Sequence, residues 1–162
     1  MFREMRRKKQ LLSQAATIEI LQSGSSGVLA TSGDNGYPYA VPLSYVYRDG
    51  KLFFHFAKAG HKLEAISRNA KVSFCVIDRD EVKPQAFTTH YRSVIVFGKM
   101  RILGKTNEKK SALKSLVEKY SPEFMAAGQR EIEHEWSRVC VAELQIEQMT
   151  GKAALDIIKQ PE

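Results

Sequence analysis

Residues 54–65 read FHFAKAGHKLEA, and this stretch joins a strand pattern to a helix pattern across a glycine. In the strand, alternation of side chains places His55 on one face among apolar neighbours. Gly60, His61 and Lys62 then form a loop and the first turn of a predicted helix. Unpaired N–H groups and the helix dipole favour an anion at such a turn, and the lysine adds a positive charge. The stretch therefore predicts a phosphate-sized anion site near a histidine.

Each part of this stretch also has a simpler structural interpretation. His55 could be a core histidine that is satisfied by one hydrogen bond, because burying an unpaired imidazole is costly. Gly60 to Lys62 could equally be a solvated loop whose lysine contacts nothing. The sequence alone does not decide whether His55 is a core or a site residue, or whether residues 60–62 bind an anion or only face solvent.

Turn signals on the N-terminal side indicate consecutive antiparallel strands. GDNG (33–36) and RDG (48–50) supply the positive φ angles of tight hairpins, and they separate predicted strands over 27–32 and within 37–57. Pro38 and Pro42 fall inside the second strand. Because proline removes a ladder hydrogen bond, this strand should lie at an edge or be interrupted beside a ligand.

The remaining chain alternates strand and helix patterns. We expect a helix from Ser13 to Gln22 with Ser13 as its cap, a helix over 60–68, a strand over 71–77, a polar connection over 78–93, a strand over 93–103 that is apolar on both faces, helices over 107–122 and 123–136, and a strand over 139–152 with Glu143 on its polar face. This order predicts a mainly β (β+α) fold, a small antiparallel barrel of about six or seven strands with peripheral helices.

Length and composition predict one domain, residues 1–162, preceded by a basic arm over 1–12. The chain has 162 residues and is 43% hydrophobic, which is enough for one core. The two cysteines, Cys75 and Cys140, are far apart inside strand patterns, so we expect buried, reduced thiols and no disulfide framework.

The net charge of +7 is concentrated at the N-terminus, where residues 1–10 hold five basic residues and one acidic residue. This distribution does not favour a nucleic-acid partner, and a basic RNA-binding barrel is the weakest alternative. No apolar stretch approaches the roughly 20 residues of a membrane helix, so a cytoplasmic protein without a membrane partner is expected. Motifs for dinucleotide binding, phosphate-binding loops, serine hydrolysis and metal ligation are also absent from the sequence.

Several motifs, taken in order, carry a family resemblance: GVLAT (27–31), YPYAVPLSYVY (37–47), HFAKAGHKLEAI (55–66), FTTHYRSVIVFGKMRIL (87–103) and IEQMTGK (146–152). In this order they resemble the pyridoxamine 5'-phosphate oxidase-like, FMN-binding split-barrel superfamily, and within it the nitroimidazole-resistance (nitroimidazole reductase-like) branch. The chain ends GKAALDIIKQPE (151–162), without the arginine-rich substrate motif of the pyridoxal-phosphate-forming branch. That activity is therefore not expected.

The resemblance implies a split-barrel homodimer with FMN at the subunit interface. It also implies that VPLSY passes the flavin ring and that HFAKAGHK (55–62) supplies ribityl and phosphate contacts, with His61 and Lys62 holding the phosphate. THYRS would reach the cofactor from the same or the partner chain. The cofactor-binding residues expected on this basis are Pro42, Leu43, Ser44, His55, Phe56, Ala57, Lys58, Gly60, His61, Lys62, Arg92 and Ser93. His55 is the candidate catalytic residue, and Arg92 or Lys58 could stabilise reduced flavin.

The function that follows from the resemblance is an FMN-dependent oxidoreductase. It would take electrons from NAD(P)H and reduce a nitroaromatic or similar small acceptor, with the protein supplying binding, orientation and charge. The alternative from another class is a flavin or haem carrier or sensor without turnover.

Overall fold

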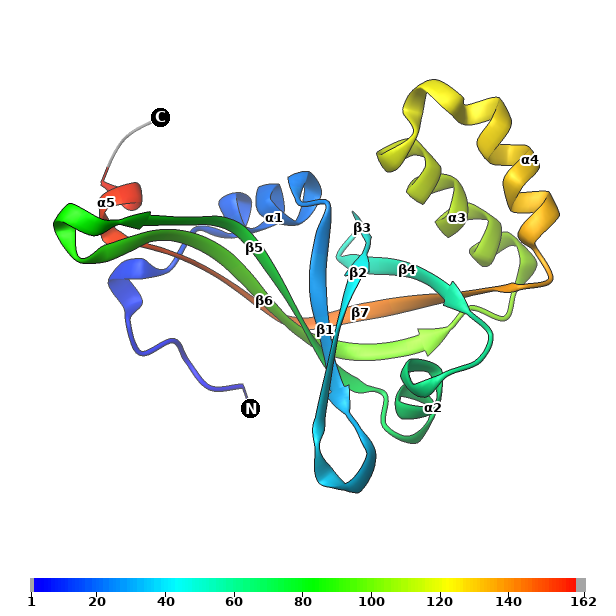
Figure 1. Ribbon diagram of the computed structural model, residues 1–162, viewed down its shortest axis with the longest axis horizontal. Helices are drawn as coiled ribbons and strands as arrows, with labels where there is room; N and C mark the ends of the chain where they lie inside the picture. The colour runs from blue at the N-terminus through cyan, green and yellow to red at the C-terminus, as the bar shows by residue number, and fades with distance from the viewer. Residues whose placement is uncertain (1, 160–162) are drawn as a thin grey trace.

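The computed structural model describes residues 2–159, which form one curved antiparallel sheet flanked by helices (Figure 1). The strand order is β2-β1-β5-β6-β7-β4-β3. The strands are β1 Ser26–Ser32, β2 Pro38–Ser44, β3 Val46–Arg48, β4 Lys51–Ala57, β5 Lys71–Lys83, β6 Thr88–Ile102 and β7 Val139–Ala153. In the described part of the chain the edge strands β2 and β3 do not pair, so the sheet is an open, split barrel. The predicted mainly β fold of six or seven strands is confirmed.

Helices cover the ends and one side of this sheet. They are α1 Gln14–Ser23, α2 His61–Arg68, α3 Thr106–Tyr120, α4 Met125–Glu135 and α5 Leu155–Ile158. Ser13 caps α1 as predicted, because its Oγ accepts a hydrogen bond from the Ala16 N–H at 3.1 Å. None of the helices within residues 2–159 is long and apolar enough to cross a membrane.

The core lies inside the curve of the sheet. Phe74 of β5 packs edge-to-face against Tyr45 and Phe54, with ring centroids 5.0 and 5.1 Å apart. A second cluster forms where α3 covers β4 and β7, so both faces of these strands are buried there. Glu143 lies on this second face and is only 4% exposed, although the sequence pattern placed it on a polar face.

The prediction of consecutive strands within residues 37–57 is wrong at Tyr45. This residue interrupts the run between β2 and β3, which end at opposite edges of the sheet. Its ring is fully buried, and its backbone N–H and C=O both pair with the Tyr120 hydroxyl, at 2.8 and 2.7 Å. A side-chain partner thus replaces a neighbouring strand. The edge position predicted from Pro38 and Pro42 is confirmed.

The predicted polar connection over 78–93 is also wrong. β5 continues to Lys83 and β6 begins at Thr88, so the two strands form one long hairpin around the short turn η3 (Pro84–Ala86). Phe87 follows this turn with φ 49° and is 98% exposed. The hairpin extends beyond the core, and none of its residues over 78–93 is fully buried, which accounts for its polar composition.

β6 lies centrally in the sheet, as predicted, but only one of its faces is buried. Val94, Val96 and Met100 face the core, whereas Ile95 and Phe97 are exposed. Cys75 on β5 lies opposite Ile95 and is only partly buried, so of the two free thiols Cys140 alone is buried as expected. The sheet thus presents an open apolar face. The predicted domain limits at residues 1 and 162 lie outside the described residues.

Candidate functional site

His55 is not a core histidine. Its ring lies on the face of β4 that carries Phe53, but beyond the packed cluster, and the residue is exposed toward a cavity. Partial burial by the surrounding walls lowers the pKa of the His55 imidazole below its usual value. The ring is therefore neutral near pH 7 and can donate one hydrogen bond from an N–H.

The cavity beside His55 has a volume of about 890 Å³. Ser44, His55, Phe56 and Ala57 form its wall on the sheet side. The opposite wall comes from the α3–α4 pair, which stands over this end of the sheet in Figure 1. A largely apolar cavity of this size with a few polar groups is typical of cofactor and small-molecule sites.

The turn between β4 and α2 lies next to this wall. Gly60 has φ 117°, a conformation that favours glycine, and its carbonyl accepts hydrogen bonds from the N–H groups of Leu63 and Glu64. The N–H groups of His61 and Lys62 have no backbone or side-chain acceptor within residues 2–159. The Lys62 ammonium lies 5.3 Å from the ring centroid of Phe56. Free N–H groups and a lysine thus adjoin a residue that lines the cavity, and they suit a phosphate.

His61 points away from this arrangement. Its ring stacks on Tyr39 of β2, with centroids 4.1 Å apart, and its Nε2 is 3.5 Å from a carboxylate oxygen of Asp34. That contact lacks hydrogen-bond geometry, so the buried Nε2 has no hydrogen-bond partner within the described residues. Arg68 also pairs with Asp34, at 2.5 Å. The carboxylate makes the His61 side of the turn less suitable for an anion than the Lys62 side.

The VPLSY residues divide between two environments. Leu43 packs against the core, whereas Pro42 and Ser44 are exposed on the edge strand β2. Only Ser44 of these three lines the cavity. Lys58 is exposed in the connection that follows β4.

Arg92 and Ser93 lie far from the cavity in the same chain. They pair with Ala153 and Lys152 at the far end of β7, whereas Phe56 pairs with Cys140 near its start. Thirteen residues separate the two positions on β7, about 40 Å along a strand. Figure 1 shows the β5–β6 hairpin and the α3–α4 pair at opposite ends of the molecule. Arg92 also pairs with Asp78, at 2.5 Å.

The helical wall of the cavity was not predicted from the sequence, and neither was Tyr120, which fixes the backbone next to the cavity residue Ser44. Leu113, Leu116 and Val117 of α3 line the cavity, but their spacing is that of an ordinary core helix. Tyr120 at the end of α3 holds Tyr45, next to Ser44, through its hydroxyl. The available signal was Gly128 on α4, where any Cβ would collide with Val117 and which therefore marks the close packing of the two helices.

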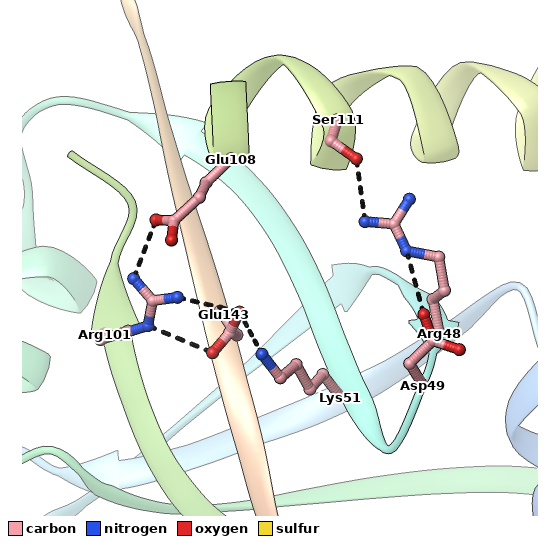
Figure 2. Close-up of polar contacts among 7 residues, drawn as sticks. All are labelled: Arg48, Asp49, Lys51, Arg101, Glu108, Ser111 and Glu143. Carbon is pink, nitrogen blue, oxygen red and sulfur yellow. Dashed lines mark hydrogen bonds and ion pairs between the residues drawn. The ribbon is translucent and has the colours of Figure 1, made fainter. Parts of the chain in front are cut away.

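A second polar cluster lies at the other end of α3 (Figure 2). The buried Glu143 carboxylate accepts hydrogen bonds from Lys51 Nζ at 3.1 Å and from Arg101 Nε at 3.1 Å, and Arg101 also bonds Glu108 at 3.1 Å. Arg48 donates to Ser111 at 3.0 Å. Arg48 Nε also lies 3.9 Å from Asp49. Three cations and three carboxylates therefore balance among these residues, and the cluster joins β3, β4, β6 and β7 to α3 without a free charge for a ligand.

Solved structures share this fold. A protein named for 5-nitroimidazole antibiotic resistance from Bacteroides thetaiotaomicron is 22% identical, with a TM-score of 0.72 over 88% of this chain and 85% of that one. An FAD-binding protein from Mesorhizobium loti is 27% identical, with a TM-score of 0.62 over 90% and 97%. An FAD and haem binding protein from Mycobacterium smegmatis is 21% identical, with a TM-score of 0.78 over 90% and 73%. None of the curated proteins matches this chain.

The sequence also matches a family model over most of its length. The match to the pyridoxamine 5'-phosphate oxidase model covers residues 13–153, from the cap of α1 to the end of β7. It includes every strand of the sheet and both walls of the cavity. We conclude that the chain belongs to the pyridoxamine 5'-phosphate oxidase family.

Proposed function

We propose that the protein is an FMN-dependent oxidoreductase that reduces nitroaromatic or similar small acceptors with electrons from NAD(P)H. The proposal rests on one observation: at the end of β4, an open cavity lies next to a turn whose free N–H groups and lysine suit a phosphate. Lys62 and the N–H groups of the first turn of α2 would hold the phosphate, and Ser44 and His55 would meet the ring edge. Flavin bound there supplies reversible electron transfer.

In this proposal His55 orients the acceptor. Its neutral imidazole donates a hydrogen bond to a nitro oxygen, while the apolar cavity wall excludes water. In the overall reaction, one NAD(P)H and one proton convert a nitro group to a nitroso group, with release of NAD(P)+ and one water. His55→Ala should lower turnover of nitrobenzene by at least about tenfold while melting temperature and FMN affinity stay close to wild type. Parallel loss of FMN, melting temperature and activity would instead make His55 a structural residue.

The open face of the sheet supports a homodimer as part of this proposal. Val28, Cys75 and Ile95 are cross-strand neighbours, with Ile77 and Phe97 beside them, and Phe97 is 41% exposed even though Phe2 stacks on it. A contiguous apolar patch of this kind suits a two-fold interface. Sedimentation of FMN-loaded protein tests it, and a monomer with stoichiometric FMN would contradict it.

A second candidate is a flavin or haem carrier without turnover. An exposed, neutral imidazole on an apolar cavity is a suitable haem ligand, and the Mycobacterium smegmatis neighbour is named as an FAD and haem binding protein. The absorption spectrum of the purified protein distinguishes the candidates. A flavin spectrum with NAD(P)H-dependent nitroreduction supports the oxidoreductase, whereas a Soret band lost in His55→Ala supports the carrier.

A further inference from the structure

We propose that the cavity beside β4 prefers acceptors that join a flat apolar ring to a positive charge, and that Glu131 is the residue that recognises this charge. The inference rests on the proposed function, because it assigns a substrate class to the same cavity. It is carried by the chemistry of the cavity wall that α3 and α4 contribute.

The inner part of this wall is apolar. Leu113, Leu116 and Val117 come from α3, and Phe124 and Ile132 come from the segment that leads into and along α4. Such a surface binds the flat, weakly hydrated part of an aromatic molecule. It offers no group that could compensate a charge, so any charged substituent of a ligand has to lie at the rim.

The rim carries one uncompensated negative charge. Glu131 and Glu135 of α4 both line the cavity, together with Arg138. Arg138 Nη1 lies 3.2 Å from Glu135, and His134 Nδ1 lies 3.0 Å from the same carboxylate. Glu131 makes no ion pair within 4.0 Å among residues 2–159, although ligand atoms of His134 and Glu135 lie within 4.8 Å of its carboxylate. It is therefore the carboxylate that is left to meet a ligand.

Among the described residues, no cation on the sheet side of the cavity cancels this charge. His55 is neutral near pH 7, because partial burial lowers the pKa of its imidazole. Lys58 follows Ala57 but does not line the cavity, and Lys109 donates its hydrogen bonds to the carbonyls of Trp136 and Val139. Glu131 is exposed at the rim, so water screens its charge and the preference is modest: cations should be favoured and anions disfavoured there.

The test compares three acceptors of one shape and different charge: 4-nitrobenzylamine, 4-nitrobenzyl alcohol and 4-nitrobenzoate. With FMN-loaded protein, kcat/KM should be highest for the amine and lowest for the benzoate. Glu131→Gln should reduce the amine-to-benzoate ratio by about two- to fivefold, the size of a partly exposed ion pair. The matched control is Glu133→Gln, since Glu133 bonds Gln129 at 2.7 Å and does not line the cavity. It should leave the ratio unchanged.

The neutral alcohol separates this inference from the proposed function. If the alcohol is reduced but the amine-to-benzoate ratio is near one, or is the same in Glu131→Gln, the assignment of Glu131 is overturned and the oxidoreductase proposal stands. If no acceptor is reduced, the oxidoreductase proposal fails, and calorimetric Kd values for the amine and the benzoate on the same protein decide the inference. Equal Kd values overturn it; tighter binding of the amine that weakens in Glu131→Gln supports it.

Discussion

Replacing Tyr120 by phenylalanine removes one oxygen atom that holds the break between β2 and β3. The Tyr120 hydroxyl accepts a hydrogen bond from the Tyr45 N–H at 2.8 Å and lies 2.7 and 2.5 Å from the carbonyls of Tyr45 and Ser25. Without it the Tyr45 N–H has no strand partner. An unsatisfied buried donor costs about 1–3 kcal/mol. Since Tyr120 is itself partly exposed and water can reach the position, we expect a loss of about 1–2 kcal/mol.

Urea unfolding measures this loss as a lower midpoint at an unchanged m value. Tyr37→Phe is the control, because Tyr37 is 75% exposed in a turn and its replacement should change stability by less than about 0.5 kcal/mol. The site should respond as well, since Ser44, which precedes Tyr45, lines the cavity, and we expect weaker FMN binding in Tyr120→Phe. Equal stability of the two variants would refute the reasoning that Tyr120 holds the strand break.

Three further predictions test the site and its supports. Lys62→Ala should weaken FMN binding by about tenfold or more and riboflavin binding far less, because a charge-assisted phosphate contact contributes about 1.5–3 kcal/mol. Calorimetry with both ligands checks this, and equal losses of affinity for the two ligands contradict a phosphate contact. Glu143→Gln should cost about 1–3 kcal/mol in urea unfolding, whereas Glu147→Gln, which affects only a surface pair with Lys99, should cost less than about 0.5 kcal/mol. Burial lowers the pKa of Lys119 to about 8, so between pH 8 and 10 the unfolded chain binds more protons than the folded one. The unfolding free energy of the wild type should therefore rise with pH relative to that of Lys119→Met. A difference between the two unfolding free energies that does not change with pH argues against a buried ammonium.

The alternation of side chains predicted the face of His55 correctly but could not decide what lies opposite it. Phe53 on the same face is buried by α3, whereas His55, two residues further along, meets open space. The boundary between core and cavity is set by where α3 and α4 end. That position depends on packing between the two helices: Gly128 marks a close approach in the sequence, but the sequence does not show that Val117 is the residue it meets.

The two errors in the strand prediction have physical causes as well. Tyr45 continues a strand-like run, and the residue that replaces its strand partner, Tyr120, lies 75 positions later in the chain. The hairpin around Pro84 was predicted as a connection because its strands lack a buried face, and a period of two is visible only where one face is apolar. In both places the backbone pairing was decided by contacts distant in sequence.

The separation of Arg92 from His55 constrains how the family resemblance can apply to this chain. The resemblance assigns both residues to one cofactor, yet they lie at opposite ends of β7. β6 and β7 remain paired between the two positions, so in this structure the two residues lie near opposite ends of one continuous two-stranded ribbon. If both residues serve one flavin, a second chain has to supply one of them, and the β5–β6 hairpin that carries Arg92 extends beyond the core with Phe87 exposed at its turn. The proposals of a shared flavin site and of a homodimer therefore stand together. FMN affinity that is lost in Arg92→Ala and restored when this variant is mixed with Lys62→Ala protein would support a site built from two chains, because the mixed dimer contains one intact site.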